Sequence, residues 1–355
     1  SMLDVDVLVV GGGSAGHVLP ALPLIRALRE QGSEVLFVGT HSGAEVGWLE
    51  GSGIDCVAIS AGKLRRYFSW QNSTDIGRTL RGIVQAYRLI GQYRPQVVFS
   101  KGGFVSFPVV FAAWLRRVPV VAHESDLTPG LANRLVLPFV KTLCLSFIST
   151  PVRHRRVRVV YTGNPVRSEI LSGDKQRGRS RLGFDGQKPV LVVTGGSLGA
   201  DALNEAVRAA LPQLGRRFDI LHVCGRGKTD QSSNPGYVQR EFIDKHWGDM
   251  LAAADVVLSR AGANAFFELL ALHKPHLLVP LAAKVSRGDQ LANAEYGEKH
   301  GFSAVLQEQD LAPETLVEAL DRVLAAQLQY VSAMAQSATN DATALLLDEL
   351  NRWSG

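Results

Sequence analysis

An apolar strand followed by a glycine-rich turn occurs twice in this chain, about half the chain apart. Residues 7–10 lead into Gly11-Gly12-Gly13-Ser14-Ala15-Gly16, and residues 190–193 lead into Gly195-Gly196-Ser197-Leu198-Gly199. A buried strand, a glycine turn and a helix form the first unit of a Rossmann-like domain. Because each half opens with this unit, the sequence predicts two Rossmann-like domains in tandem.

Apolar runs alternate with amphipathic, helix-length stretches through both halves of the chain. We predict strands at residues 5–10, 35–38, 97–100, 118–122, 142–145, 157–161, 189–193, 219–223, 255–258 and 276–279. We predict helices at residues 19–31, 80–93, 109–117, 200–211, 263–272, 290–300 and 333–353. This alternation is typical of parallel sheets with helices on both faces, so the predicted fold class is α/β.

A turn marks the joint between the two predicted domains. Asn164-Pro165 follows the predicted strand at 157–161 after two residues, and this dipeptide favours a turn. We therefore place the first domain at residues 1–163 and the second at residues 164–337. A C-terminal helix at about residues 338–355 is a candidate to return to the first domain.

Cysteine usage and hydropathy exclude several protein classes. The three cysteines, Cys56, Cys144 and Cys224, lack any paired spacing, which argues against a disulfide framework or a zinc site and for a reducing, cytosolic compartment. The uncharged apolar stretch at residues 102–115 contains Pro108 and is shorter than the roughly 20 apolar residues of a membrane span. The first residues do not have the pattern of a secretory signal.

Positive charge is concentrated between residues 61 and 120. The whole chain has a net charge of +5, yet this segment alone contains ten Lys or Arg residues and one acid, Asp75. Residues 63–68 and 114–117 mix cations with large apolar side chains, a combination that docks to anionic lipid headgroups. The predicted membrane contacts are Lys63, Leu64, Arg65, Arg66, Phe68, Trp114 and Arg116. The alternative is a solvated helix face over core aromatics; nucleic acid is disfavoured because no recognised binding motif accompanies the charges.

The first glycine loop satisfies the dinucleotide fingerprint G-x-G-x-x-G, which taken alone suggests NAD. That fingerprint also requires an acidic residue at the end of the second strand, to bind the ribose hydroxyls. Here the second strand ends in Gly39-Thr40-His41, and its acid, Glu34, lies at the opposite end. The sequence therefore argues against NAD, although the loop can still bind another anionic ligand through its backbone N–H groups.

Further motifs extend the glycine loop to a pattern that covers nearly the whole chain. They are Gly11-Gly12-Gly13-Ser14-Ala15-Gly16-His17 with Pro20, Gly102-Gly103-Phe104-Val105-Ser106, His123-Glu124, Gly163-Asn164-Pro165-Val166-Arg167, Gly195-Gly196-Ser197, Phe242-Ile243-Asp244, Ser259-Arg260-Ala261-Gly262 and Asp289-Gln290. In this order they resemble the MurG family, the UDP-N-acetylglucosamine:lipid I transferases of peptidoglycan synthesis. The resemblance implies a GT-B fold, in which two Rossmann-like domains with parallel sheets face each other across a cleft. It places the acceptor on the first domain and the UDP-sugar on the second.

The resemblance also implies a reaction, a location and partners. The reaction is transfer of N-acetylglucosamine, with inversion, from UDP-N-acetylglucosamine to the C4 hydroxyl of the muramoyl sugar of lipid I, giving lipid II. The location is the cytoplasmic face of the bacterial cell membrane, with the protein bound peripherally, and other proteins of cell-wall synthesis are candidate partners. No cofactor and no metal ion are implied, and the chain has no Asp-x-Asp run suited to a magnesium diphosphate.

Several positions depart from the pattern of the family. Asp126 stands where an amide is common, Leu198 where glutamine is often found, and Arg287-Gly288-Asp289-Gln290 replaces a more glutamine-rich run. These departures bear on which residues recognise the sugar and leave the resemblance intact. Beside the function that the resemblance implies, three others stay open. They are a UDP-sugar transferase with another lipid or natural-product acceptor, a UDP-N-acetylglucosamine 2-epimerase, and a non-catalytic UDP-sugar-binding protein.

Two residues are candidates for the base that an inverting transfer requires to take the proton of the acceptor hydroxyl. His17 follows the first glycine loop, and Glu124 follows the predicted strand at 118–122. Each has a non-catalytic alternative, a helix-capping histidine and a solvated loop carboxylate. The resemblance adds five acceptor-side residues: Ser14, Ala15, Gly16, Asp126 and Asn133.

The resemblance assigns the donor to the second domain. The implied donor-binding residues are Arg167, Gly196, Ser197, Ile243, Gly262, Ala263, Glu268, Asp289 and Gln290. Arg167 would neutralise the diphosphate, or else only hold the hinge, and Glu268 would accept hydrogen bonds from the ribose hydroxyls. Ile243 would border the uracil or pack in the core. Asp289 would bind the sugar or cap its helix.

Overall fold

The computed structural model describes most of the chain. The described residues are 5–12, 17–18, 20–41, 49, 53–62, 70–127, 129–148, 150–152, 156–195, 201–243, 245–283, 288–337 and 341–355. Contacts divide the chain into two compact units, Ser1–Pro165 together with Asn340–Gly355, and Val166–Thr339. Each unit is an α/β domain built on one parallel sheet.

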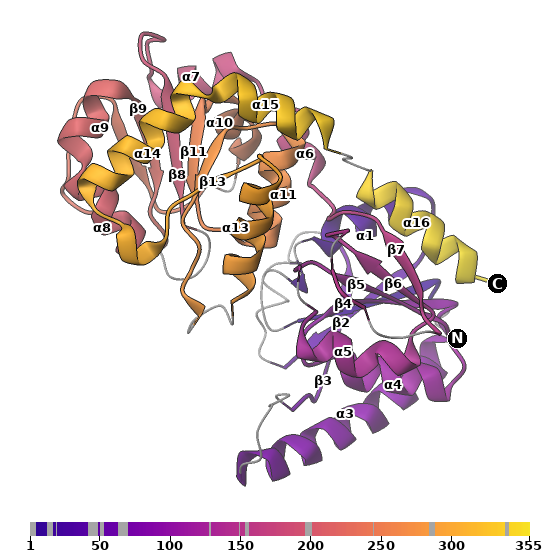
Figure 1. Cartoon of the computed structure of the whole chain (residues 1–355). Coiled ribbons are helices and arrows are strands. Elements are labelled where there is room, and N and C mark those ends of the chain that lie inside the picture. The colour runs from indigo at the N-terminus through magenta and orange to yellow at the C-terminus, as the bar shows by residue number, and fades with distance from the viewer. Residues whose placement is uncertain are drawn as a thin grey trace. The chain divides into compact units, whose positions relative to one another are not determined.

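The first domain contains a seven-stranded sheet in the order β3-β2-β1-β4-β5-β6-β7. Its strands are β1 (Val7–Gly11), β2 (Val35–Thr40), β3 (Asp55–Ile59), β4 (Val97–Gly102), β5 (Val120–Glu124), β6 (Thr142–Leu145) and β7 (Arg158–Tyr161). Its helices are α1 (Ala21–Glu30), α3 (Trp70–Tyr93), α4 (Ser106–Leu115), α5 (Leu131–Val136), the 3₁₀ turn η2 (Leu137–Phe139) and α16 (Ala342–Trp353) (Figure 1). The strand order reverses between β1 and β4, and such a switch point is where ligands bind in open α/β sheets.

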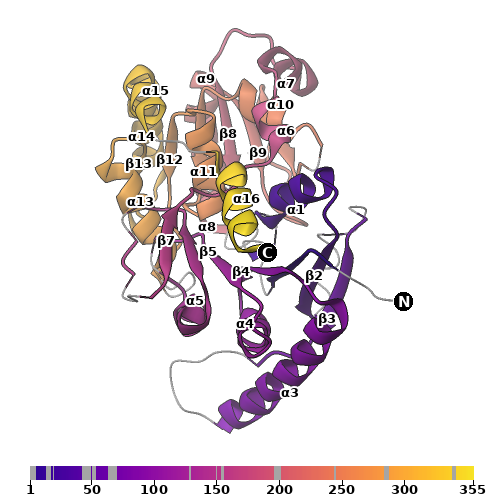
Figure 2. The same cartoon turned by 90° about the vertical axis from the view of Figure 1, so that its right-hand side faces the viewer.

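Helices cover both faces of this sheet because its strands are apolar on both sides. In β1, Leu8 and Val10 face the core formed with α3 and α4, whereas Val7 and Val9 face α1 and α16. Figure 2 shows α3 and α4 side by side on this domain. The interpretation of these strands as buried on both faces is confirmed.

The last helix is fixed to the first domain by a buried carboxylate. Glu349 of α16 accepts hydrogen bonds from Thr142 Oγ1 at 3.0 Å and from Arg158 Nη2 at 3.1 Å. Trp353 donates its indole N–H to the same Thr142 hydroxyl at 2.9 Å. Leu346 and Leu350 bury the apolar face of the helix against α1.

The second domain contains a six-stranded sheet in the order β10-β9-β8-β11-β12-β13. Its strands are β8 (Val190–Thr194), β9 (Asp219–Val223), β10 (Tyr237–Arg240), β11 (Val256–Ser259), β12 (His276–Leu278) and β13 (Ala304–Val305). Its helices are α6 (Ser168–Leu171), α7 (Lys175–Leu182), α8 (Asp201–Ala209), α9 (Leu211–Arg217), α10 (Trp247–Ala253), α11 (Ala263–Ala271), α13 (Asp289–Lys299), η3 (Glu308–Asp310), α14 (Pro313–Ala325) and α15 (Gln327–Gln336). The strand order of this sheet reverses between β8 and β11. Each domain therefore has a switch point at which the carboxyl ends of the strands can bind a ligand.

The structure corrects the sequence-based prediction in two respects. Strands β3, β10 and β13 were not predicted, because they are short and do not form apolar runs. The single helix predicted at 333–353 is wrong: α15 ends at Gln336, and α16 begins at Ala342. Asp341 caps α16 by accepting a hydrogen bond from the backbone N–H of Ala344 at 3.1 Å.

Candidate active site

The carboxyl ends of β1, β4 and β5 bring three titratable side chains to one edge of the first sheet. His17 follows β1, Lys101 lies near the end of β4, and Glu124 is the last residue of β5. The strands are parallel neighbours, so their ends meet at the same edge. Lys101 and Glu124 are only 2% and 6% exposed, so their charges lie in a poorly solvated environment.

Glycines allow the end of β4 to approach the loop after β1 closely. A Cβ at Gly103 would lie 2.1 Å from the carbonyl oxygen of Gly12, and one at Gly11 would lie 2.3 Å from the carbonyl oxygen of His17. Gly102 has φ of +115° and lies against the His17 ring, where a Cβ would be 3.3 Å from Cδ2. The paired glycines 102 and 103 therefore position the imidazole.

His17 has its ring orientation set by the backbone. Its Nδ1 lies 3.1 Å from the carbonyl oxygen of Gly12, which fixes the tautomer with the proton on Nδ1. Burial, and then the positive charge of Lys101, lower the pKa of His17 to about 4. The imidazole is therefore neutral near pH 7 and can accept a proton.

Glu124 is held in place by backbone donors. Its carboxylate accepts hydrogen bonds from the N–H of Gly130 and, at 3.5 Å, from the N–H of Asp126. Burial and the nearby charge of Asp126 raise the pKa of Glu124 toward neutrality, although the two backbone donors and Lys101 act in the opposite direction. A carboxyl group with such a pKa suits proton transfer near pH 7.

Hydrogen bonds of Asn133 and His123 hold the carboxyl end of β5 in place. Asn133 Nδ2 donates to the carbonyl oxygen of His123 at 3.3 Å, and the side chain is 4% exposed. His123 Nε2 donates to the carbonyl oxygen of Gly163 at 2.9 Å, so it ties β5 to the segment after β7. The structure thus places Asn133 in contact with the backbone that carries Glu124.

Lys101 is a site residue that the sequence analysis missed. It was counted only as one cation of the basic segment, whereas its Nζ is buried and donates to Ser125 Oγ. Ser125 Oγ in turn donates to Asn164 Oδ1 at 3.2 Å. No signal in the sequence marked it, because the predicted strand ends at residue 100, whereas β4 extends to Gly102 and is buried throughout.

The second domain pairs two of its predicted donor-binding residues. Arg167 Nη2 lies 3.2 Å from Glu268 Oε1, and Glu268 projects from the middle of α11. Burial raises the pKa of Glu268, and the guanidinium of Arg167 lowers it in opposition. Gly262, in extended conformation, is the N-cap of α11, and Ala263 is its first residue. The first backbone N–H groups of a helix have no partner within the helix, which is a favourable arrangement for an anion.

Gln290 has a structural role in the described chain. Its Oε1 accepts hydrogen bonds from the backbone N–H of Ala261 at 3.2 Å and of Leu281 at 2.9 Å. It therefore joins the ends of β11 and β12 to the start of α13. Asp289 is the first residue of α13 and Gly288 is the N-cap, so the interpretation of Asp289 as the N-cap is wrong.

Ile243 and Phe242 follow the carboxyl end of β10. Ile243 is partly buried, whereas Phe242 is 52% exposed. The guanidinium of Arg226 lies 5.7 Å from the centroid of the Phe242 ring. An exposed aromatic beside an apolar residue at a strand end can border a flat ring.

Other predicted residues lie outside the described part of the chain. They are the acceptor-side residues Ser14, Ala15 and Gly16, the donor-side residues Gly196 and Ser197, and the membrane contacts Lys63, Leu64, Arg65, Arg66 and Phe68. Among the described residues, no group of three or more His, Cys, Asp or Glu side chains is placed to hold a metal ion.

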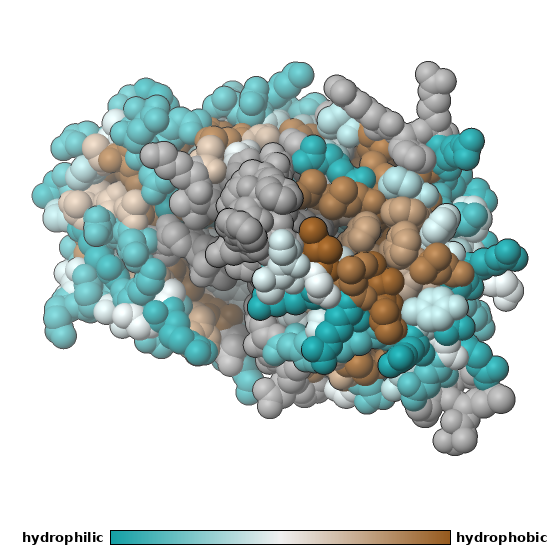
Figure 3. Space-filling model, turned by 90° about the horizontal axis from the view of Figure 1, so that it is seen from below, coloured by the Kyte–Doolittle hydropathy of each residue, from teal (hydrophilic) through white to brown (hydrophobic). Residues whose placement is uncertain are grey.

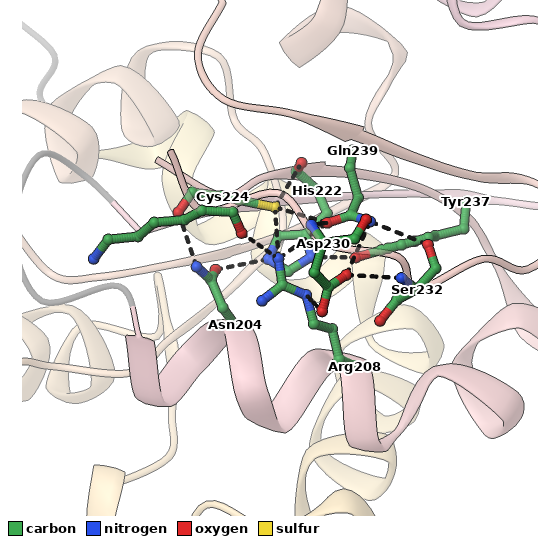
Figure 4. A network of polar contacts seen from close by, with 9 residues as sticks. Asn204, Arg208, His222, Cys224, Asp230, Ser232, Tyr237 and Gln239 are labelled. Atoms are coloured by element: carbon green, nitrogen blue, oxygen red, sulfur yellow. Dashed lines mark hydrogen bonds and ion pairs between the residues drawn. The ribbon is translucent and has the colours of Figure 1, made fainter. Parts of the chain in front are cut away.

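A second polar cluster lies in the second domain, between α8 and the strands β9 and β10 (Figure 4). We call it the Arg208 network; its members are Asn204, Arg208, His222, Cys224, Asp230, Ser232, Tyr237 and Gln239. His222 is wholly buried, and its ring nitrogens lie 2.7 Å from Tyr237 Oη and 2.8 Å from Asn204 Oδ1. Arg208 Nε lies 3.1 Å from Asp230 Oδ2, and Nη2 donates to Gln239 Oε1 at 3.0 Å. The network joins the helix after the second glycine loop to the two strands beside it.

The outer surface of the first domain has an apolar stripe along α3. The stripe consists of Ile76, Leu80, Val84 and Tyr87, each more than 40% exposed and spaced along one face of the helix. Trp114 of α4 is 50% exposed, and its ring packs against Phe111 and Phe139. The guanidinium of Arg116 lies 3.8 Å from the centroid of the Tyr87 ring and joins α4 to the stripe. Figure 3 shows an apolar area on the face seen from below, bordered by hydrophilic side chains.

The described helices include none long and apolar enough to cross a bilayer. Helix α3, which carries the stripe, packs on its other face against α4.

Comparison with known proteins gives matches over both domains. The model of the glycosyltransferase family 28 N-terminal domain matches residues 7–144, and that of the family 28 C-terminal domain matches residues 190–347. The chain is 47% identical, over 96% of its length and 97% of the relative's, to a UDP-N-acetylglucosamine–N-acetylmuramyl-(pentapeptide) pyrophosphoryl-undecaprenol N-acetylglucosamine transferase of Geobacillus thermodenitrificans. A Lachnoclostridium phytofermentans protein of the same name is 48% identical over 95% of each chain.

Solved structures show the same architecture. The crystal structure of MurG from Acinetobacter baumannii aligns with a TM-score of 0.78 and 26% identity, over 98% of this chain and 99% of that one. A putative UDP-N-acetylglucosamine 2-epimerase from Listeria monocytogenes aligns with a TM-score of 0.72 at 14% identity, over 98% of this chain and 96% of that one, which shows a shared fold alone. The two parallel-sheet domains are those of a GT-B glycosyltransferase, as predicted.

Proposed function

The chain belongs to glycosyltransferase family 28 and, within it, to the MurG family, and from this premise we propose that it converts lipid I to lipid II. It is a glycosyltransferase, and the donor and acceptor are UDP-N-acetylglucosamine and the undecaprenyl-linked muramoyl pentapeptide. The observation that carries this proposal is identity of 47% over 96% of the chain, which includes both domains. A 2-epimerase and a natural-product transferase are supported only by likeness of fold.

The proposed chemistry is a single displacement at the anomeric carbon. The C4 hydroxyl oxygen of the muramoyl sugar forms a bond to that carbon, and the bond from the carbon to the β-phosphate oxygen of UDP breaks. The hydroxyl proton passes to a base on the protein, and UDP leaves with the bonding electron pair. Attack opposite the leaving group inverts the anomeric configuration.

We assign the base to Glu124 and a positioning role to His17. Glu124 has a pKa raised toward neutrality, so its carboxylate form can take a proton near pH 7 without being too weak a base. His17 has a pKa of about 4 and is a weaker base, but its neutral ring can orient the acceptor hydroxyl. Asp126, which follows Glu124 by two residues, is proposed to bind the acceptor sugar.

On the donor side, we propose that UDP binds at the carboxyl edge of the second sheet. The start of α11, at Gly262 and Ala263, would present backbone N–H groups to an anion, and Glu268 would accept hydrogen bonds from the ribose hydroxyls. Arg167 now pairs with Glu268 and would turn to the diphosphate as its charge grows. Ile243 is proposed to border the uracil, and Asp289 to bind the sugar; Ser14, Ala15, Gly16, Gly196 and Ser197 retain the roles that the resemblance implies.

We further propose that the first domain docks on the anionic cytoplasmic leaflet through the apolar stripe and Trp114. A lipid-linked acceptor requires the protein to reach a bilayer surface, and an exposed apolar helix face beside cations suits that surface. Arg116 and the basic residues at 63–66 would supply the attraction to the headgroups. Docking of this kind is peripheral and reversible.

The test is a transfer assay with purified protein, UDP-N-acetylglucosamine and a short-chain lipid I analogue. We expect UDP release that depends on the acceptor, and a disaccharide lipid product identified by mass spectrometry. His17→Ala should retain donor binding and lose at least about tenfold in turnover. Release of UDP with no disaccharide lipid, or donor binding with no release, would contradict the proposed acceptor.

A further inference from the structure

Lys101 is a buried amine to which the proposed reaction assigns no role. It lies near the end of β4, is 2% exposed and is among the largest side chains buried in the chain. Burying an unneutralised ammonium is costly, so such a residue is tolerated only where neighbouring groups compensate its charge. The surroundings of Lys101 therefore indicate what its charge is for.

A chain of hydrogen bonds connects Lys101 to the segment that follows β7. Its Nζ donates to Ser125 Oγ, and Ser125 Oγ donates to Asn164 Oδ1 at 3.2 Å. Ser146 Oγ lies 3.5 Å from the same Asn164 oxygen and 3.4 Å from the carbonyl oxygen of Gly163. Lys101 thus connects the residue directly after Glu124 to a buried, hydrogen-bonded framework.

Four titratable side chains face Lys101 from two other elements. Glu124 and Asp126, at and after the end of β5, are negative and favour its ammonium form. His17, after β1, and His123, in β5, have their pKa values lowered chiefly by burial and secondarily by the charge of Lys101. Burial lowers the pKa of Lys101 itself to about 8, so the amine is mostly protonated at pH 7.

We propose that Lys101 is a positioning residue for the acceptor-side groups of this site. Its ammonium favours the carboxylate form of the base, Glu124, and the neutral form of the His17 ring, and its hydrogen bond to Ser125 holds the end of β5. This inference deepens the proposed transferase function and rests on it. It applies whichever of Glu124 and His17 takes the proton, because the positive charge lowers the pKa of both.

Electrostatic and purely structural roles for Lys101 can be separated by three variants. Lys101→Met keeps the length of the side chain and removes the charge and the donor. Ser125→Ala removes the hydrogen-bond partner and keeps the charge. Lys101→Arg keeps the charge and changes the shape.

The measurement is the pH dependence of kcat/KM for lipid I analogue transfer. We expect the acidic limb of Lys101→Met to move upward by about 1 pH unit, the size of a nearby charge effect. Activity at pH 7 should then fall about fivefold and recover substantially at pH 9, which a folding defect would not allow. Ser125→Ala and Lys101→Arg should keep the native acidic limb, and the KM for UDP-N-acetylglucosamine should not change. An unmoved limb in Lys101→Met, or an equal shift in Ser125→Ala, overturns the proposal.

A second readout keeps this inference separate from the proposed function. The pKa of His17, followed by NMR of the imidazole nitrogens, should rise in Lys101→Met and stay in place in Ser125→Ala. If the native protein transfers nothing to lipid I, the proposed function fails, and the His17 titration still decides the role of Lys101. An unchanged His17 pKa in Lys101→Met would overturn it.

Discussion

Each domain buries a polar cluster beside the carboxyl ends of its strands, but the two clusters are built differently. In the first domain, the charge of Lys101 acts on both Glu124 and His17. Burial favours the neutral form of all three groups: it lowers the pKa of Lys101 and of His17 and raises that of Glu124. In the Arg208 network of the second domain, both ring nitrogens of His222 have fixed partners, and Arg208 is paired with Asp230. One cluster consists of coupled charges and the other of partnered dipoles around one ion pair.

A shifted pKa alone does not distinguish these two kinds of cluster. His17 and His222 both have a pKa of about 4, and burial is the first cause in both. The difference is that the charge acting on His17 belongs to Lys101, which interacts with the carboxyl groups of Glu124 and Asp126, whereas Arg208 beside His222 is paired with Asp230. We therefore expect substitutions in the first cluster to change catalysis and substitutions in the Arg208 network to change stability.

The largest expected effect is that of Glu124→Gln. Turnover should fall by about 10²–10⁴-fold, because an amide cannot take the acceptor proton. The free energy of unfolding should change by less than about 1 kcal/mol, since the amide oxygen can still accept from the Gly130 N–H. Steady-state transfer at saturating substrates, with thermal unfolding as the control, measures both. A turnover within tenfold of native would move the base assignment to His17.

The opposite pattern is expected for His222→Leu. Removing the imidazole leaves the Tyr237 hydroxyl and the Asn204 carboxamide oxygen without their buried partner, which should lower the free energy of unfolding by about 2–4 kcal/mol. Turnover per folded molecule should stay near native. Urea unfolding at pH 7.5 gives the stability, and Tyr237→Phe is the matched control with a cost of about 1 kcal/mol. A large loss of turnover in a folded His222→Leu protein would show that the network serves catalysis.

Acid should weaken the second domain through two buried histidines. Burial lowers the folded-state pKa of His222 and of His276 to about 4, from the ordinary histidine value of 6.5. Between these values the unfolded state binds the proton more readily, so stability is full above about pH 6.5 and falls as pH drops toward 4. The loss can reach about 3 kcal/mol for each histidine. Urea midpoints from pH 7.5 to 4.5 test this, and His222→Leu should show a shallower decline than native.

Glu268→Gln should act on the donor rather than on the acceptor. Losing the carboxylate removes a charged hydrogen-bond acceptor for the ribose, so the Kd for UDP-N-acetylglucosamine should rise about ten- to a hundredfold. The Arg167 pair is lost as well, yet Arg167 is partly exposed and its pairing adds little stability. Calorimetric titration of native and variant protein with donor alone gives the ratio. Unchanged donor affinity would remove Glu268 from the nucleotide site.

The sequence contained most of the fold because the central strands are continuous apolar runs. Those runs gave the positions of β1, β4, β8 and β11 to within a few residues. The strands at the sheet edges, such as β3 with its exposed Asp55, carry polar residues and have no such signal. The break before α16 did have one, the N-cap Asp341, but helix-forming residues on both sides concealed it.

The candidate site was less accessible to sequence reasoning, since its contacts join distant residues. His17 and Glu124 were found because each follows an apolar strand and stands in a family motif. The Arg167–Glu268 pair spans 101 positions, and only the folded domain brings the two side chains together. Lys101 was hidden by its type: a lysine in a basic segment is expected at the surface, and only the burial of β4 shows otherwise.

The smallest expected effect tests whether the first domain alone contacts the bilayer. Leu80→Asp, in the middle of the apolar stripe, should weaken binding to vesicles rich in anionic phospholipid by about five- to tenfold. The substitution removes exposed apolar area that would enter the bilayer and adds a negative charge, which the anionic lipid repels. Leu328→Asp on α15 is the matched control: Leu328 is 85% exposed in the second domain, and its replacement should leave vesicle binding unchanged. Both variants should transfer normally to a soluble acceptor. Vesicle co-sedimentation at two salt concentrations separates the electrostatic contribution of the cations from the hydrophobic contribution of the stripe, because only the electrostatic contribution weakens with salt. Equal losses for Leu80→Asp and Leu328→Asp would mean that net charge, rather than the stripe, controls association.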